Sequence, residues 1–352
     1  MLTSVPEGNY YVIVKVNILN ALNESSYENN VCVSLMTTEV GYPTLSIGEQ
    51  VDRNMTTDQY IYYKLLVGPE YEGQTLLCTL TTFEQQVANG LYLSHENVPT
   101  LTQYDYGQYA PFMQEIEVLI PVLEQGVYYL LAKGSTQNGN PQLVSIATTI
   151  INFEILHVDA DHGSNTGSIT TKVTGAKFDS IMDFRLVQGG QFLPAEKVFF
   201  SNSTETYTTF DLAEMPLGVY AMEAELPGGI ITIKGDAFTI EEGMPAELVV
   251  NIVAPASVRN GTIFSVNIEY GNIGTTDLNV SGFVVVSRNG HPIGITTEAL
   301  EEGHTELTFD TKEANGNPDV LRPGYRGTKA IMVKATHSSN VSLAVYAIRR
   351  QY

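Results

Sequence analysis

The chain has 352 residues, a length that predicts two to four domains rather than one core. It carries 39 acidic against 18 basic residues, a formal net charge of -21, and such a surface repels phosphate backbones and anionic lipids. Nucleic acid partners and binding to membrane surfaces are therefore not expected. The most apolar window, residues 118–131, is interrupted by Pro121 and Glu124, so membrane insertion is not predicted either.

Strand-forming residues dominate the composition, with 20 Tyr and 13 Phe, while 30 Gly and 15 Pro supply turns. Short runs alternate apolar and polar positions along the whole chain, as in residues 10–16 and 264–268. Period-two alternation between turn residues indicates half-buried strands. The sequence therefore predicts an all-β protein.

Turn residues accumulate near residues 39–43, 157–167 and 241–245. These stretches divide the chain into residues 1–39, 40–154, 155–243 and 244–352. Each of the last three pieces is long enough for a β-sandwich of roughly 100 residues.

The first piece is too short for a sandwich, because residues 8–19 and 31–38 supply only two strands. We therefore expect the chain to begin inside a domain. The more apolar face of this hairpin carries Tyr10, Val12, Val14 and Val16. That face is expected to pack on the neighbouring domain or on a second molecule.

The first two pieces resemble modules of bacterial surface and secreted proteins. Gly8-Asn9-Tyr10-Tyr11, followed by Asn23-Glu24-Ser25 and Glu28-Asn29-Asn30, resembles the closing hairpin of a CARDB-type domain, so residues 1–39 look like part of such a domain. Four blocks stand out in residues 40–154: Thr44-Leu45-Ser46-Ile47-Gly48-Glu49, Tyr62-Tyr63-Lys64-Leu65, Gln74-Thr75-Leu76 and Gly126-Val127-Tyr128-Tyr129-Leu130-Leu131-Ala132. In these blocks the piece resembles a pre-peptidase C-terminal (PPC) domain.

The last two pieces resemble immunoglobulin-like modules. Residues 155–243 are similar to IPT/TIG domains in blocks such as Thr174-Gly175-Ala176-Lys177-Phe178, Gly218-Val219-Tyr220 and Pro227-Gly228-Gly229. Residues 244–352 resemble a second CARDB-like or other immunoglobulin-like sandwich, in Glu269-Tyr270-Gly271-Asn272 and Leu321-Arg322-Pro323-Gly324-Tyr325. Together the resemblances imply tandem β-sandwich domains of immunoglobulin-like and jelly-roll-like type.

These modules imply an extracellular or cell-surface location and a non-catalytic function in structure or adhesion. The expected partners are neighbouring domains of the same polypeptide, a glycan or a surface protein. An alternative is a carbohydrate- or protein-binding accessory region of a secreted enzyme that lies outside this chain. Module resemblance alone does not decide between the two.

No catalytic residue is predicted. The six histidines are scattered, no Gly-x-Ser-x-Gly motif is present, and no residues have the spacing of a zinc site. Cys32 and Cys78 lie in apolar strand-like runs, where we expect buried, unpaired thiols rather than a bridge.

Two segments are candidates for ligand binding. Asp159, Asp161 and Asn165 place oxygen ligands at alternate positions, as in a calcium loop, although Gly163 and the missing terminal Glu depart from that pattern. Calcium is thus the one candidate cofactor, and a plain interdomain turn is the favoured alternative. The second segment is an aromatic, polar loop with Tyr104, Tyr106 and Tyr109, whose rings would stack on sugars or else cover a sandwich edge.

Overall fold

The computed structural model describes residues 7–19, 21–136, 139–279, 282–311, 320–337 and 340–348. Strands account for 57% and helices for 2%, which confirms the all-β prediction. Among the described residues the one α-helix is α1 (Thr297–Glu301), whose N-terminus is capped by the Thr296 hydroxyl. The chain divides into two compact units, Met1–Ile151 and Asn152–Tyr352.

The first unit begins with a long hairpin of four short strands. β1 pairs with β4 and β2 with β3, both antiparallel, and a turn of 3-10 helix, η1 (Glu28–Asn30), precedes β3. The strands are β1 (Gly8–Tyr10), β2 (Ile13–Lys15), β3 (Val31–Val33) and β4 (Thr38–Val40). The Glu7 carboxylate ties the base of the hairpin to the following domain, because it accepts from Lys64 Nζ at 2.8 Å and from the Tyr42 amide at 2.9 Å.

The expected cover for the apolar hairpin face is not supplied by the neighbouring domain. Tyr10, Val12, Val14 and Val16 are between 36% and 55% exposed, and Tyr11 and Ile13 of the opposite face are exposed as well. The reason is that strands of only three residues form no continuous surface that could dock onto the next domain. Packing of this face on a second molecule stays a prediction.

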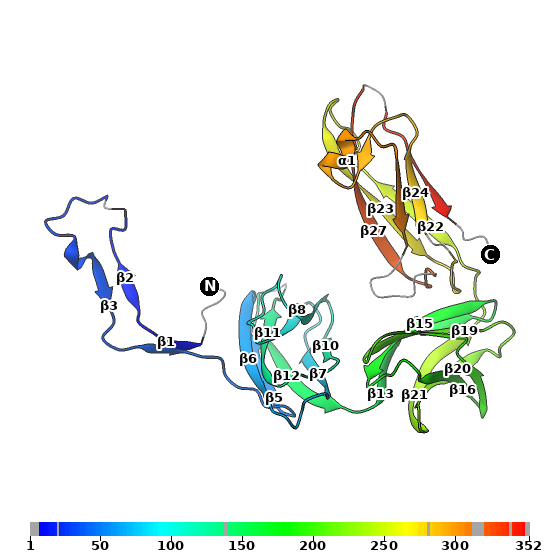
Figure 1. Ribbon diagram of the computed structural model, residues 1–352, viewed down its shortest axis with the longest axis horizontal. Coiled ribbons are helices and arrows are strands. Elements are labelled where there is room, and N and C mark those ends of the chain that lie inside the picture. The colour runs from blue at the N-terminus through cyan, green and yellow to red at the C-terminus, as the bar shows by residue number, and fades with distance from the viewer. Residues whose placement is uncertain are drawn as a thin grey trace. The chain divides into compact units, whose positions relative to one another are not determined.

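The rest of the first unit is a β-sandwich, the first sandwich, built from strands β5 to β12 (Figure 1). One sheet has the order β10-β7-β12-β5 and the other β6-β11-β8-β9. The strands are β5 (Gln50–Met55), β6 (Gln59–Val67), β7 (Thr75–Thr82), β8 (Ala88–His95), β9 (Tyr106–Pro111), β10 (Glu115–Ile120), β11 (Gly126–Gly134) and β12 (Gln142–Ile151). Alternate residues such as Leu76, Leu91 and Leu130 meet between the sheets as one core.

The second unit holds two more sandwiches. The second sandwich pairs the sheet β13-β15-β19-β18 with β14-β21-β20-β16-β17, around a core that includes Phe184, Phe210 and Phe238. Strands β14 and β21 run parallel. The strands are β13 (Glu154–Asp159), β14 (His162–Ser164), β15 (Ser168–Ala176), β16 (Asp183–Gln188), β17 (Gln191–Pro194), β18 (Lys197–Asn202), β19 (Glu205–Asp211), β20 (Gly218–Leu226) and β21 (Ile230–Glu241).

The third sandwich has the sheets β22-β23-β27-β25 and β26-β24-β28, with α1 in the connection after β25. Its core includes Tyr270, Phe283 and Val333. The strands are β22 (Leu248–Val253), β23 (Ile263–Asn272), β24 (Gly282–Ser287), β25 (Ile293–Gly294), β26 (Glu306–Asp310), β27 (Arg326–Lys334) and β28 (Leu343–Ile348). The domain limits 39, 154 and 243 stay predictions, although each sandwich core lies within one of the proposed segments.

Both cysteines are free, but only one is buried as expected. Cys78 lies in the core of the first sandwich, and burial raises the pKa of its thiol well above the ordinary value. Cys32 is exposed, because β3 belongs to the uncovered hairpin. In the part of the chain that the structure describes, no helix is long and apolar enough to span a membrane.

Candidate functional site

Tyrosines gather on the outer face of the sheet β6-β11-β8-β9 in the first sandwich. Residues that pair across neighbouring strands point to the same face, and the register aligns Lys64 with Tyr129 and Tyr62 with Leu131. Leu131 in turn pairs with Tyr92, and Tyr92 with Gly107. The leucines at the intervening positions point into the core. We define the tyrosine face as Tyr42, Tyr60, Tyr62, Tyr92, Tyr104, Tyr109 and Tyr129.

Ring contacts join these side chains. Tyr42, which precedes β5, lies 5.6 Å from Tyr62 and 5.4 Å from Tyr129 between ring centroids. At the other end of the face, the Tyr92 and Tyr104 rings lie 4.9 Å apart. These separations and tilts are typical of favourable aromatic pairs, so the rings hold one another in place.

Two glycines make room for the Tyr92 ring. A Cβ at Gly107, directly opposite on β9, would lie 2.6 Å from the Tyr92 ring and 3.0 Å from the Tyr104 ring. A Cβ at Gly90 would lie 2.7 Å from the far edge of Tyr92. Tyr92 therefore lies across the sheet instead of standing up from it, and only 5% of the residue is exposed.

The electrostatics of this face differ from those of the acidic chain around it. Its strands contribute two charged residues at outward positions, Lys64 and Lys133, and both have acidic partners: Glu7 at 2.8 Å and Asp58 at 3.8 Å. The hydrogen bond from Lys64 holds the pKa of Glu7 below its usual value. Burial raises the pKa of Tyr62 and Tyr92, so their hydroxyls stay neutral donors and acceptors.

The structure separates the three tyrosines that the sequence groups in one loop. Residues 106–111 form the edge strand β9, and successive side chains of a strand point to opposite faces. Tyr104 and Tyr109 lie on the tyrosine face and are 41% and 54% exposed. Tyr106 pairs with core residue Leu93 and packs against the core, where burial raises its pKa. Tyr106 therefore does not belong to the face.

The sequence did not predict five members of the face as ligand residues: Tyr42, Tyr60, Tyr62, Tyr92 and Tyr129. Their signal was nevertheless present: Tyr60 and Tyr62 alternate along one strand. What was missing was the strand order, which alone shows that β6, β11, β8 and β9 are neighbours.

The three calcium candidates have three different partners. The Asp159 carboxylate accepts a hydrogen bond from Arg322 at 3.0 Å, and Asp161 lies 2.9 Å from the His162 ring nitrogen. The Asn165 amide donates to the Met215 carbonyl oxygen at 3.5 Å. Within the described ranges, no group of three or more His, Cys, Asp or Glu residues is placed to hold a metal. The calcium site therefore stays a prediction.

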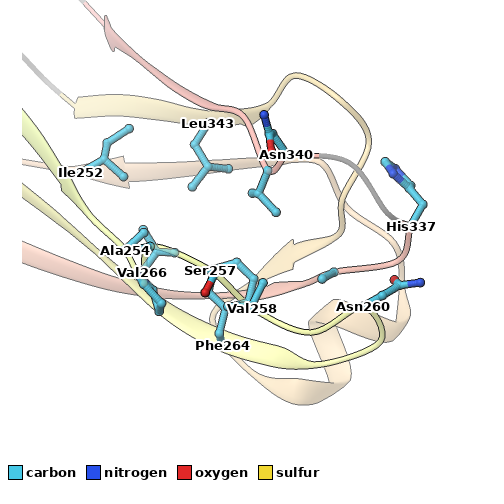
Figure 2. Close-up of a pocket in the computed structure, with 14 residues that line it drawn as sticks. Ile252, Ala254, Ser257, Val258, Asn260, Phe264, Val266, His337, Asn340 and Leu343 are labelled. Carbon is cyan, nitrogen blue, oxygen red and sulfur yellow. The ribbon is translucent and has the colours of Figure 1, made fainter.

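A pocket of about 760 Å³ opens in the third sandwich beside the edge strands β22 and β28 (Figure 2). Its lining combines apolar side chains, Ile252, Phe264 and Leu343 among them, with the polar Ser257, Asn260 and Asn340. His337 lies at its rim and stacks on the buried His291 at 4.0 Å. No carboxylate is among the described residues that line it.

No model of a known protein family and no curated protein matches this sequence. Among solved structures, the chain is similar to the pre-peptidase C-terminal domain of collagenase from Bacillus anthracis, with 14% identity over 31% of this chain and 94% of that chain, at a TM-score of 0.25. It is also similar to Aeromonas hydrophila PliG, a periplasmic inhibitor of g-type lysozyme, with 11% identity over 30% of this chain and 96% of that chain, at a TM-score of 0.22. The I9-I11 tandem of titin matches 84% of this chain over 95% of its own length, with 6% identity and a TM-score of 0.19. Scores this low carry no argument about function, and no catalytic family is identified.

Proposed function

We propose that this chain is a non-catalytic, adhesive segment of a secreted or cell-surface protein and that it contacts carbohydrate through the tyrosine face. The observation that supports the proposal is the face itself: seven tyrosines on one side of a single sandwich, five of them joined by ring contacts and all backed by the core. Preorganised aromatic rings lose little conformational freedom on binding.

The chemistry of the face suits a neutral glycan. Sugar rings present C–H groups that pack on aromatic faces and hydroxyls that exchange hydrogen bonds with tyrosine hydroxyls. Because Lys64 and Lys133 already have acidic partners, the face has little excess charge with which to attract an anionic ligand. Binding by this route is expected to change little with salt.

Retention on insoluble polysaccharides and a glycan array test the proposal. We expect the full chain to bind at least one neutral glycan, and Tyr104→Ala combined with Tyr109→Ala to weaken binding at least about tenfold, a loss of about 1.4 kcal/mol. Both residues are more than one-third exposed, so their removal leaves the core intact. Tyr346→Ala, at a 51% exposed tyrosine of the third sandwich, is the matched control and should bind normally.

Two results would contradict the proposal. If the full chain binds no glycan, the carbohydrate contact is wrong. If it binds but the Tyr104 and Tyr109 variant binds equally well, the site lies elsewhere. Binding that disappears when salt is raised would point instead to an electrostatic contact through the lysines.

A further inference from the structure

The second and third sandwiches meet through main-chain and side-chain hydrogen bonds. The amide of Ser164, in β14, donates to the Thr275 carbonyl oxygen at 3.1 Å, and the Asp277 amide donates to the Ser168 carbonyl oxygen at 2.9 Å. The hydroxyl of Thr170, a fully buried residue of β15, donates to the Asp277 carboxylate at 2.6 Å. One loop of the third sandwich is thus hydrogen-bonded to the second sandwich at three places.

Arg322 adds a charged contact from a different part of the third sandwich. Its two terminal nitrogens donate to the main-chain oxygen and to the carboxylate of Asp159, both at 3.0 Å. The guanidinium carbon lies 5.5 Å from the centre of the Tyr207 ring, and only 7% of the Arg322 side chain is exposed. A guanidinium enclosed to this degree needs fixed partners, since removing them would leave a buried charge unpaired.

The loop that makes these contacts is itself fixed by Asn272. This buried side chain donates to the carbonyl oxygens of Thr276 at 2.8 Å and Leu321 at 2.9 Å. Its oxygen accepts from the Gly274 amide at 3.0 Å. Thr275, between them, donates to the carbonyl oxygen of Met244 in the connection that joins the two sandwiches. The loop, the Arg322 segment and the connection therefore form one hydrogen-bonded assembly.

We propose that the second and third sandwiches are locked into one rigid body, with Arg322 and Asp277 as the positioning residues of the lock. Domains joined only by a short connection are expected to hinge about it. Here the contacts of Arg322 and Asp277 lie outside the connection, so a hinge movement would break charge-assisted hydrogen bonds and take the fixed partners away from the buried Arg322 guanidinium. Force or ligand binding at one sandwich is then transmitted to the other without bending.

The test is a distance measurement between the two sandwiches in the full chain. Spin labels are placed at the exposed positions Gln191 and Glu302 by substitution with Cys, in a Cys32→Ser background. Cys78 is buried and stays unlabelled. For the otherwise unchanged chain we expect one narrow distance distribution by pulsed electron paramagnetic resonance. In the Arg322→Ala and Asp277→Ala double variant we expect a distribution at least about twofold broader.

Matched variants separate a lock from general loss of structure. Arg288→Ala removes an exposed arginine of the third sandwich that bonds Tyr346, and should leave the distribution narrow. Thr170→Val and Arg322→Lys each remove part of the lock at nearly constant side-chain volume, and each should broaden the distance distribution. These two variants replace the double variant if the double variant fails to fold. A broad distribution in the parent chain overturns the proposal, as does a narrow one in every folded lock variant.

Discussion

Gly107→Ala is expected to disrupt the tyrosine face at the end that holds Tyr92 and Tyr104. The added methyl carbon would lie 2.6 Å from the Tyr92 ring and 3.1 Å from the Leu91 carbonyl oxygen, so Tyr92 must lift from the sheet. Aromatic side chains bury about 150–250 Å², and re-exposing roughly half of that at about 25 cal/mol/Å² costs about 2–3 kcal/mol. If the neighbours shift instead, overpacking costs about 1–3 kcal/mol, a similar amount.

Thermal unfolding of the full chain measures this loss. For a sandwich of roughly 100 residues, each kcal/mol lowers the melting temperature by about 4–8 °C, so a loss of about 2–3 kcal/mol should lower the transition of the first sandwich by about 8–24 °C. Glycan retention should weaken in the same variant, because Tyr104 loses the ring on which it packs. Gly235→Ala is the control, since its methyl group would have no neighbour within 4 Å. An unchanged transition together with unchanged Tyr92 ring resonances would refute the reasoning.

The remaining predictions concern the first unit. In the native chain Cys32 should react at once with a thiol reagent and Cys78 only after denaturation, because burial raises the pKa of the Cys78 thiol; two fast thiols would contradict the burial. The Lys64 hydrogen bond lowers the pKa of Glu7. The hydrogen bond from the Tyr42 amide to Glu7 should therefore be fully formed at a pH above the ordinary pKa of a glutamate, and it should be lost as the pH falls through the lowered pKa of Glu7. A Tyr42 amide resonance that titrates at or above the ordinary pKa of a glutamate would refute this. Deleting residues 1–38 should leave the melting of the three sandwiches nearly unchanged, since the exposed Glu7 and Lys64 pair contributes at most about 1 kcal/mol. A collapse of all transitions would show that the hairpin completes a core.

The presence of strands was predictable from the sequence because the alternation of apolar and polar residues is a local property of the chain. In residues 75–82 the buried side chains Leu76, Cys78 and Leu80 alternate with partly exposed ones, and the same pattern indicates a strand from the sequence alone. The one described α-helix was not predicted. Five residues are too few to show a helical period, and the Thr296 cap is one threonine among many.

Side-chain direction was harder to predict than strand existence. Tyr104, Tyr106 and Tyr109 looked equivalent in the sequence, but the register of β9 against β8 turns Tyr106 inward. Cys32 looked as buried as Cys78, because both have apolar neighbours. Burial depends on whether a second layer covers the strand, and the described part of the hairpin has none. Predicting the tyrosine face thus required the pairing between strands that are distant in the sequence, and a local sequence pattern does not reveal that pairing.

The net charge of the chain agrees with the proposed preference of the tyrosine face for a neutral ligand. With a net charge of -21, most approaches to the surface would require a ligand to displace water from carboxylates, whose desolvation is costly. On the tyrosine face a ligand displaces water from neutral hydroxyls and apolar rings, and its own hydroxyls can restore the lost hydrogen bonds. The two lysines of this face are paired with Glu7 and Asp58, so they contribute little to attracting a ligand. Releasing them should therefore convert the face from a neutral to an anion-attracting surface: Glu7→Gln combined with Asp58→Asn should increase retention of sulfated relative to neutral glycans at low salt. If the parent chain and this variant have the same selectivity between sulfated and neutral glycans, the ion pairs do not determine the class of ligand.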